Sequence, residues 1–170
     1  MLRRGGVQFL YQANYQHQTS MKRFFGSPLL RLIRGGVVLH RAEYQIISAM
    51  VAELPEHVQR VVVRQFNEYT VVQREADGRA LNFYKMGYFS SKPVQTSATL
   101  QGKAGEADLI SVSALTPGQS EALHATLNVI GGRVFQVSFS RPVFDLKDGQ
   151  ALKMTKFTHA WHKNFTQADA

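Results

Sequence analysis

The pattern of apolar residues predicts two helices after residue 41. In each, apolar side chains recur at intervals of three and four residues, which brings them to one face of a helix. They are Tyr44, Ile47, Val51 and Leu54 in the first helix, and Val58, Val61, Val62 and Phe66 in the second. Pro55 separates the two helices, because proline disfavours helical geometry in the preceding residue and is tolerated in a first turn.

From Asn67 the apolar residues alternate with polar ones, as in a strand with one buried face. Residues 69–75 and 79–86 flank the dipeptide Asp77-Gly78, which is typical of a tight hairpin turn. The pairs expected across this hairpin are Val71 with Tyr84 and Val72 with Phe83.

Two further hairpins and a last strand are expected. Residues 95–101 and 107–114 flank a glycine-containing loop, and residues 124–130 and 134–139 flank Gly131-Gly132-Arg133. In the latter, a three-residue loop places apolar residues opposite one another, whereas a two-residue loop mixes the faces. The pairs expected are Val129 with Phe135, Leu127 with Val137 and Ala125 with Phe139. Residues 151–158 are expected to form the final strand.

The order of these elements indicates an α+β fold: two helices followed by a mainly antiparallel, curled sheet of hairpins. Helices and strands do not alternate, so a doubly wound parallel sheet is not expected. The length of 170 residues suits one domain, and 44% hydrophobic residues are enough for a packed core. No apolar run approaches the ~18 residues of a membrane-spanning helix, so no transmembrane segment is expected.

Positive charge is concentrated before this domain. Residues 1–41 hold seven of the 20 Lys and Arg residues and none of the 12 Asp and Glu residues, whereas residues 42–170 are almost balanced. We call residues 1–41 the basic arm. Its cations, which we predict to be partner-binding, are Arg3, Arg4, Lys22, Arg23, Arg31, Arg34 and Arg41. A local cluster of this kind attracts phosphate, anionic lipid or an acidic protein face.

Three interpretations of the basic arm stay open. It is a retained segment that contacts a partner, an organelle targeting segment that is removed, or in part upstream sequence if Met21 is the natural start. Ser27 and Pro28 form a helix-start signal, and Gly35 suits the end of that helix. Such a short helix needs a surface to dock on, either its own domain or a partner.

The sequence offers few groups for catalysis or metal binding. The chain has no cysteine, which excludes disulfides, thiolate metal sites and a cysteine nucleophile. His159 and His162 are three residues apart, but neighbouring lysines disfavour a cation there. Neither a phosphate-binding glycine loop nor a serine-nucleophile motif is present, so no cofactor or catalytic residue is assigned.

An aromatic-rich stretch, residues 82–89, is expected to send alternate rings into the core. Tyr84 and Tyr88, beside Lys85 and Lys92, are candidates for a contact surface on the other face.

These observations favour a non-enzymatic binding or accessory subunit whose basic arm contacts an anionic partner. A protein partner is favoured, and nucleic acid or a peripheral membrane contact is open. The alternative is a small-ligand-binding domain or enzyme with a pocket between a curved sheet and its helices. We favour an intracellular location, in the cytoplasm or an organelle matrix.

Overall fold

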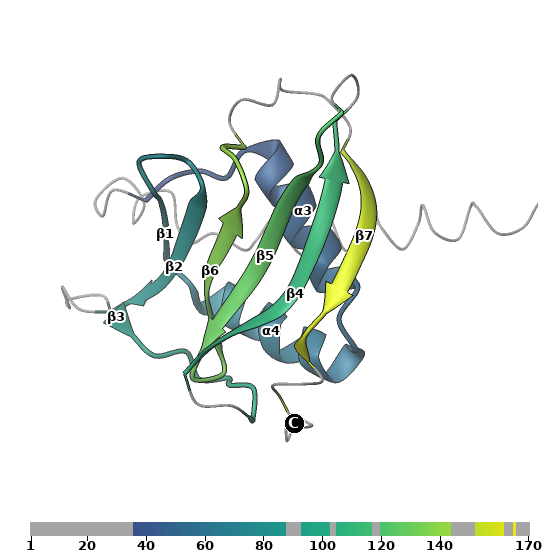
Figure 1. The fold of residues 1–170 in the computed structure, drawn as a ribbon. Coiled ribbons are helices and arrows are strands. Elements are labelled where there is room, and N and C mark those ends of the chain that lie inside the picture. The colour runs from purple at the N-terminus through teal and green to yellow at the C-terminus, as the bar shows by residue number, and fades with distance from the viewer. Residues whose placement is uncertain are drawn as a thin grey trace, which may run out of the picture.

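The structure is a computed structural model that describes residues 36–87, 93–102, 105–116, 120–143, 152–161 and 165. It contains two helices followed by a seven-stranded, mainly antiparallel sheet, which confirms the expected α+β class (Figure 1). The helix predicted to start at Ser27 lies outside the described residues. None of the helices in the described ranges is both long and apolar enough to span a membrane.

The two helices begin and end close to the expected positions. They are α3 (Arg41–Ala52) and α4 (Glu56–Glu68). Helix α3 starts with a capping box, in which the backbone N–H of His40 donates to Glu43 Oε2 at 2.7 Å. Pro55 immediately precedes α4, as its restricted backbone geometry favours.

Seven strands form the sheet. They are β1 (Val71–Arg74), β2 (Ala80–Met86), β3 (Pro93–Val94), β4 (Glu106–Leu115), β5 (Leu123–Ile130), β6 (Arg133–Phe139) and β7 (Lys153–His159). Their spatial order is β1-β2-β6-β5-β4-β7, and β3 pairs with the end of β2 (Figure 1). Every pairing is antiparallel.

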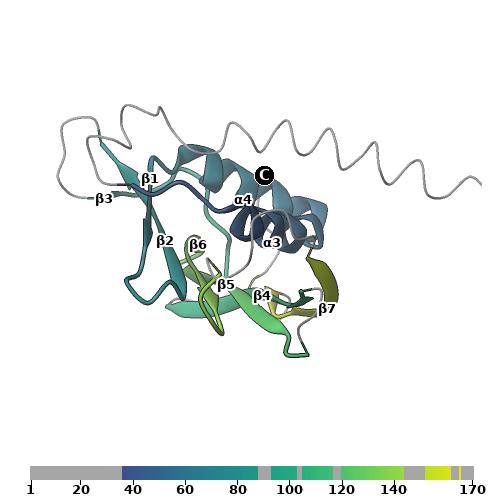
Figure 2. The same ribbon diagram turned by 90° about the horizontal axis from the view of Figure 1, so that it is seen from above.

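The molecule has two layers, with α3 and α4 covering one face of the curled sheet (Figure 2). The predicted helix faces supply the core from one side, since Ile47, Val51, Val58 and Phe66 are all buried. The inward-facing strand residues fill the other side. Those that are fully buried include Leu81, Leu109, Ile110, Leu127, Val129 and Val137. The interface between helices and sheet is therefore occupied by packed apolar side chains.

The register of the first hairpin follows from the alternation of apolar residues. Val71 is opposite Tyr84 and Val72 is opposite Phe83, as predicted. Strand β7 covers most of the expected last strand and pairs with β4 at the sheet edge. In the loop between β1 and β2, Gly78 has φ 70°, the left-handed geometry that glycine accepts readily.

The predicted three-residue loop between β5 and β6 is wrong, although two of the three expected pairs are present. Leu127 pairs with Val137 and Ala125 with Phe139, as expected, but Val129 pairs with Val134 instead of Phe135. The turn itself has two residues, both glycines at positive φ, and a β-bulge at Phe135 then shifts the register by one residue. The bulge thus returns the apolar residues to the buried face.

The predicted hairpin between residues 95–101 and 107–114 is wrong. Strand β4 pairs with β5 and β7 instead. Residues 95–100 cross toward the β5–β6 turn, where the Leu100 N–H donates to the Gly132 carbonyl at 2.9 Å. Their partners lie far away in the sequence, so local alternation could not identify them.

Candidate functional site

The described residues include one of the seven arm cations, Arg41, which is the first residue of α3 and is exposed. The other six lie outside the described ranges. Arg41 forms no ion pair with the described carboxylates. A cation in the first helical turn faces the positive end of the helix dipole, which costs roughly 0.3–1 kcal/mol. Its charge therefore does not serve the stability of α3.

The carboxylate that follows the basic arm most closely in the sequence is Glu43. It is completely buried, and both of its oxygens accept hydrogen bonds from Arg74 of β1, at 2.8 Å and 2.7 Å. The Arg74 guanidinium also donates to the Val38 carbonyl at 3.2 Å. This bidentate pair ties the start of α3 to the sheet edge and leaves Glu43 no free oxygen for another cation.

A groove opens at the end of the sheet where β2, β3 and β6 diverge. Strand β2 pairs with β6 over residues 80–82 and with β3 at residues 85–86. Phe83 and Tyr84, which lie between these two pairings on β2, therefore pair with neither β6 nor β3. The bulged residue Phe135 follows directly, on β6. The divergence leaves a groove of about 350 Å³. Its lining includes Tyr84, Lys85, Val94, Ile130, Arg133 and Phe135.

The walls of this groove are apolar and partly open to solvent. Val94 on β3 is 46% exposed and Ile130 at the end of β5 is 50% exposed. They are two of the three large apolar residues of the described chain that are exposed to this extent. Large aliphatic side chains that line a groove and are exposed to solvent are typical of a surface that binds a ligand.

Arg133 is the cation of the groove without a carboxylate partner among the described residues. Its Nε donates to the Thr96 carbonyl and its Nη1 to the Gly131 carbonyl, each at 3.3 Å. These contacts hold the guanidinium in place and compensate no charge. Glu106 lies opposite Ile130 in the sheet register but forms no ion pair with Arg133 in the described chain.

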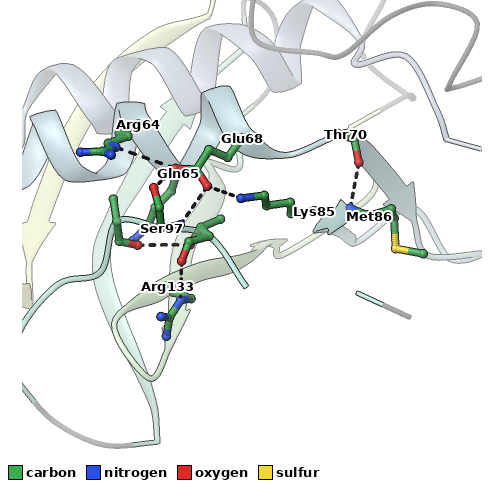
Figure 3. A network of polar contacts seen from close by, with 10 residues as sticks. Arg64, Gln65, Glu68, Thr70, Lys85, Met86, Ser97 and Arg133 are labelled. Atoms are coloured by element: carbon green, nitrogen blue, oxygen red, sulfur yellow. Dashed lines mark hydrogen bonds and ion pairs between the residues drawn. The ribbon is translucent and has the colours of Figure 1, made fainter. Parts of the chain in front are cut away.

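The second cation of the groove, Lys85, is paired with Glu68 at the end of α4 at 2.7 Å (Figure 3). Glu68 also accepts hydrogen bonds from the backbone N–H and the hydroxyl of Ser97, and Arg64 lies 3.8 Å away. Burial opposes ionisation of Glu68, but the bonds from Lys85 and Ser97 outweigh it and lower its pKa to about 2. Glu68 is thus ionised at neutral pH and a weak base.

Two buried polar side chains support the groove from below. Gln65 donates to the carbonyls of Ala98 and Gly132 and accepts from the Val134 N–H, so all its described bonds go to backbone around the groove. The Tyr69 hydroxyl donates to the Val134 carbonyl. Burial raises the pKa of Tyr69, so this phenol stays protonated near neutral pH. The floor is consequently a fixed, hydrogen-bonded framework.

The sequence identified this site in part. Phe83 is buried and Tyr84 lines the groove beside Lys85, as the alternation of residues 82–89 indicated. Tyr88 and Lys92 lie outside the described residues. Arg133, Ile130 and Val94 were missed, because only the long-range meeting of three strands brings them together. Ile130 carried a local signal, as an aliphatic residue next to a turn.

The described residues bring no metal site together. Within them, no three of the His, Asp and Glu side chains are grouped closely enough to hold an ion. His159 ends β7, whereas His162 lies outside the described ranges.

The groove thus combines apolar walls with two cations, Lys85 and Arg133. Comparisons with known proteins add no family: no family model matches the chain, and no match was found among the curated proteins or the solved structures.

Proposed function

We propose that this protein is a non-enzymatic binding or accessory subunit whose basic arm contacts an anionic partner, with an acidic protein face favoured. The sequence supports this through seven cations in residues 1–41 that no acidic residue accompanies. Electrostatic attraction of this kind acts over about 10 Å at moderate salt and speeds association with an oppositely charged surface.

The observation that supports the proposal most directly is the pairing of Glu43 with Arg74. This first carboxylate after the arm is buried and fully engaged with Arg74, so it cannot neutralise the cations that precede it. Arg41, the arm cation that the structure describes, is exposed and has no ion pair with a described carboxylate. Glu43, the carboxylate nearest to the arm in the sequence, therefore does not neutralise the positive charge of the arm, and this charge can attract an anionic partner.

The test compares two full-length variants that lose the same amount of charge. In the first, Arg3, Arg4, Lys22 and Arg23 are changed to Gln. In the matched control, the exposed body residues Arg60, Arg79, Lys153 and Lys156 are changed to Gln. Binding is measured against polyglutamate, single-stranded DNA, and vesicles of phosphatidylcholine with or without phosphatidylserine.

The proposal predicts that the arm variant loses binding to at least one anionic probe while the body variant retains it. Binding of the original chain should weaken as salt is raised. On DNA, the slope of log affinity against log salt should fall by about 0.7 for each phosphate that the arm variant no longer neutralises. Equal binding by the two variants, or no binding to any anionic probe by the original chain, would overturn the proposal.

A further inference from the structure

The groove between β2, β3 and β6 is a second interaction surface, separate in composition from the basic arm. We propose that it binds an extended peptide segment that carries apolar residues and a carboxylate, supplied by a partner protein. The segment's carboxylate meets Arg133, and its apolar side chains cover Val94 and Ile130.

Charge complementarity selects an acidic segment. Lys85 and Arg133 line the groove, and the carboxylate of the adjoining polar network is Glu68, which is paired with Lys85 and lies 3.8 Å from Arg64. Glu68 is already engaged with Lys85 and Ser97, whereas the described hydrogen bonds of Arg133 go to neutral carbonyls. A guanidinium held by two backbone carbonyls and left without a described counter-ion is prepared to bind a carboxylate.

The shape of the groove favours an extended peptide over an enclosed small molecule. A volume of about 350 Å³ lies near the lower limit for small-molecule pockets, and such pockets bury most of their ligand. Here two large aliphatic residues of the lining stay about half exposed. A peptide segment that extends beyond the groove can cover both residues. It can also lie beside Phe83 and Tyr84 on β2, which are paired with neither β3 nor β6.

The experiment uses the full-length protein and a fluorescein-labelled peptide of alternating valine and glutamate, about six residues long like a typical strand. A second peptide has lysine in place of every glutamate. Fluorescence anisotropy should detect binding of the glutamate peptide, and the lysine peptide should bind at least about tenfold more weakly.

Two sets of variants locate the binding site. Arg133→Gln should weaken the glutamate peptide about 10- to 100-fold, because a hydrogen bond to a charged group is lost. Ile130→Glu and Ile130→Lys both remove the same half-exposed aliphatic side chain, so their effects on the fold should match. The Glu variant should nevertheless bind the glutamate peptide about tenfold more weakly than the Lys variant.

The inference is overturned if neither peptide binds, if the two bind equally, or if Arg133→Gln leaves the affinity unchanged while remaining folded. It is also overturned if octanoate, a small apolar carboxylate, displaces the peptide at an equal concentration. The arm variant with four glutamines should bind the peptide like the original chain. Failure of the groove and failure of the arm proposal are therefore distinguished by separate variants.

Discussion

The side chain of Gln65 on α4 accepts a hydrogen bond from the backbone N–H of Val134 on β6 at 2.8 Å, across 69 residues of sequence. The same amide group donates to the carbonyls of Gly132 and Ala98, at 2.9 Å and 3.1 Å. One buried side chain thus joins α4, the β5–β6 turn and the segment before β4. It satisfies backbone groups at a bulge and a turn, where the ladder of strand hydrogen bonds is interrupted.

Gln65→Leu is expected to lower the free energy of unfolding by about 2–4 kcal/mol, because the Val134 amide and two carbonyls lose a buried partner. Urea denaturation followed by circular dichroism measures this change. Gln59→Leu, a half-buried position on the same helix, is the control and should change stability by less than about 0.5 kcal/mol. A stability of Gln65→Leu equal to that of the original chain would show that these bonds are not important for folding.

The pair between Glu43 and Arg74 is expected to show strong coupling. Glu43→Gln leaves the guanidinium of Arg74 without its buried counter-charge and should cost about 3–5 kcal/mol. The double variant with Glu43→Leu and Arg74→Met removes both charges and should recover part of this loss. A double-mutant cycle by urea denaturation, completed with the single variants Glu43→Leu and Arg74→Met, measures the coupling, and additive effects of these two single changes would contradict it.

The elements with local signals could be predicted from the sequence. The helix stripe that contains Ile47, the separation at Pro55 and the register of Val72 with Phe83 all depend on residues close together in the chain. Their alternation or helical spacing is sufficient to choose the buried face. For the same reason, local patterns are sufficient to indicate the α+β class without the strand order.

The groove depends on contacts that no local pattern encodes. Residues 95–101 contain apolar and polar residues compatible with a strand, yet their partners are Gln65 on α4 and Gly132 in a turn. The bulge at Phe135 lies where β6 separates from β2. It shifts the register by one residue after the two-glycine turn, so that the apolar residues of β6 stay on the buried face. Predicting Arg133 as a fixed cation requires all of these contacts together.

The pKa of Glu68 gives the protein a defined sensitivity to acid. Its pKa is lowered from 4.5 to about 2 in the folded chain, so its ion pair contributes stability above pH ~4.5. That contribution should be lost progressively as the pH falls from about 4.5 to about 2. Glu68→Gln should therefore be less stable than the original chain near neutral pH, by about 1–3 kcal/mol, with a difference that shrinks in acid.

Urea denaturation at a series of pH values measures this difference. Glu53→Gln is the control, since Glu53 is exposed and forms no ion pair with the described residues. A stability difference between the original chain and Glu68→Gln that is the same at neutral and acidic pH would contradict the assignment.

The two glycines of the β5–β6 turn should respond differently to substitution, although both have positive φ. A Cβ at Gly132 would lie 2.1 Å from the Leu100 carbonyl oxygen and 2.7 Å from Thr99 Oγ1, so Gly132→Ala requires the backbone to move. At Gly131 no heavy atom of the described residues, apart from the glycine and its chain neighbours, lies within 4 Å of the added carbon. The penalty there is confined to the left-handed backbone geometry, about 1–2 kcal/mol for Ala and less for Asn.

Gly132→Ala should accordingly destabilise the fold by more than about 3 kcal/mol. It should also disturb the hydrogen bond between Leu100 and Gly132. Leu100 follows residues 93–96, which line one side of the groove. Thermal and urea denaturation of Gly132→Ala, Gly131→Ala and Gly131→Asn measure the order of stability. We expect Gly131→Asn to be the most stable of the three variants and Gly132→Ala the least. Equal losses at both positions would mean that backbone strain alone, and not the close approach of Leu100, requires glycine in this turn.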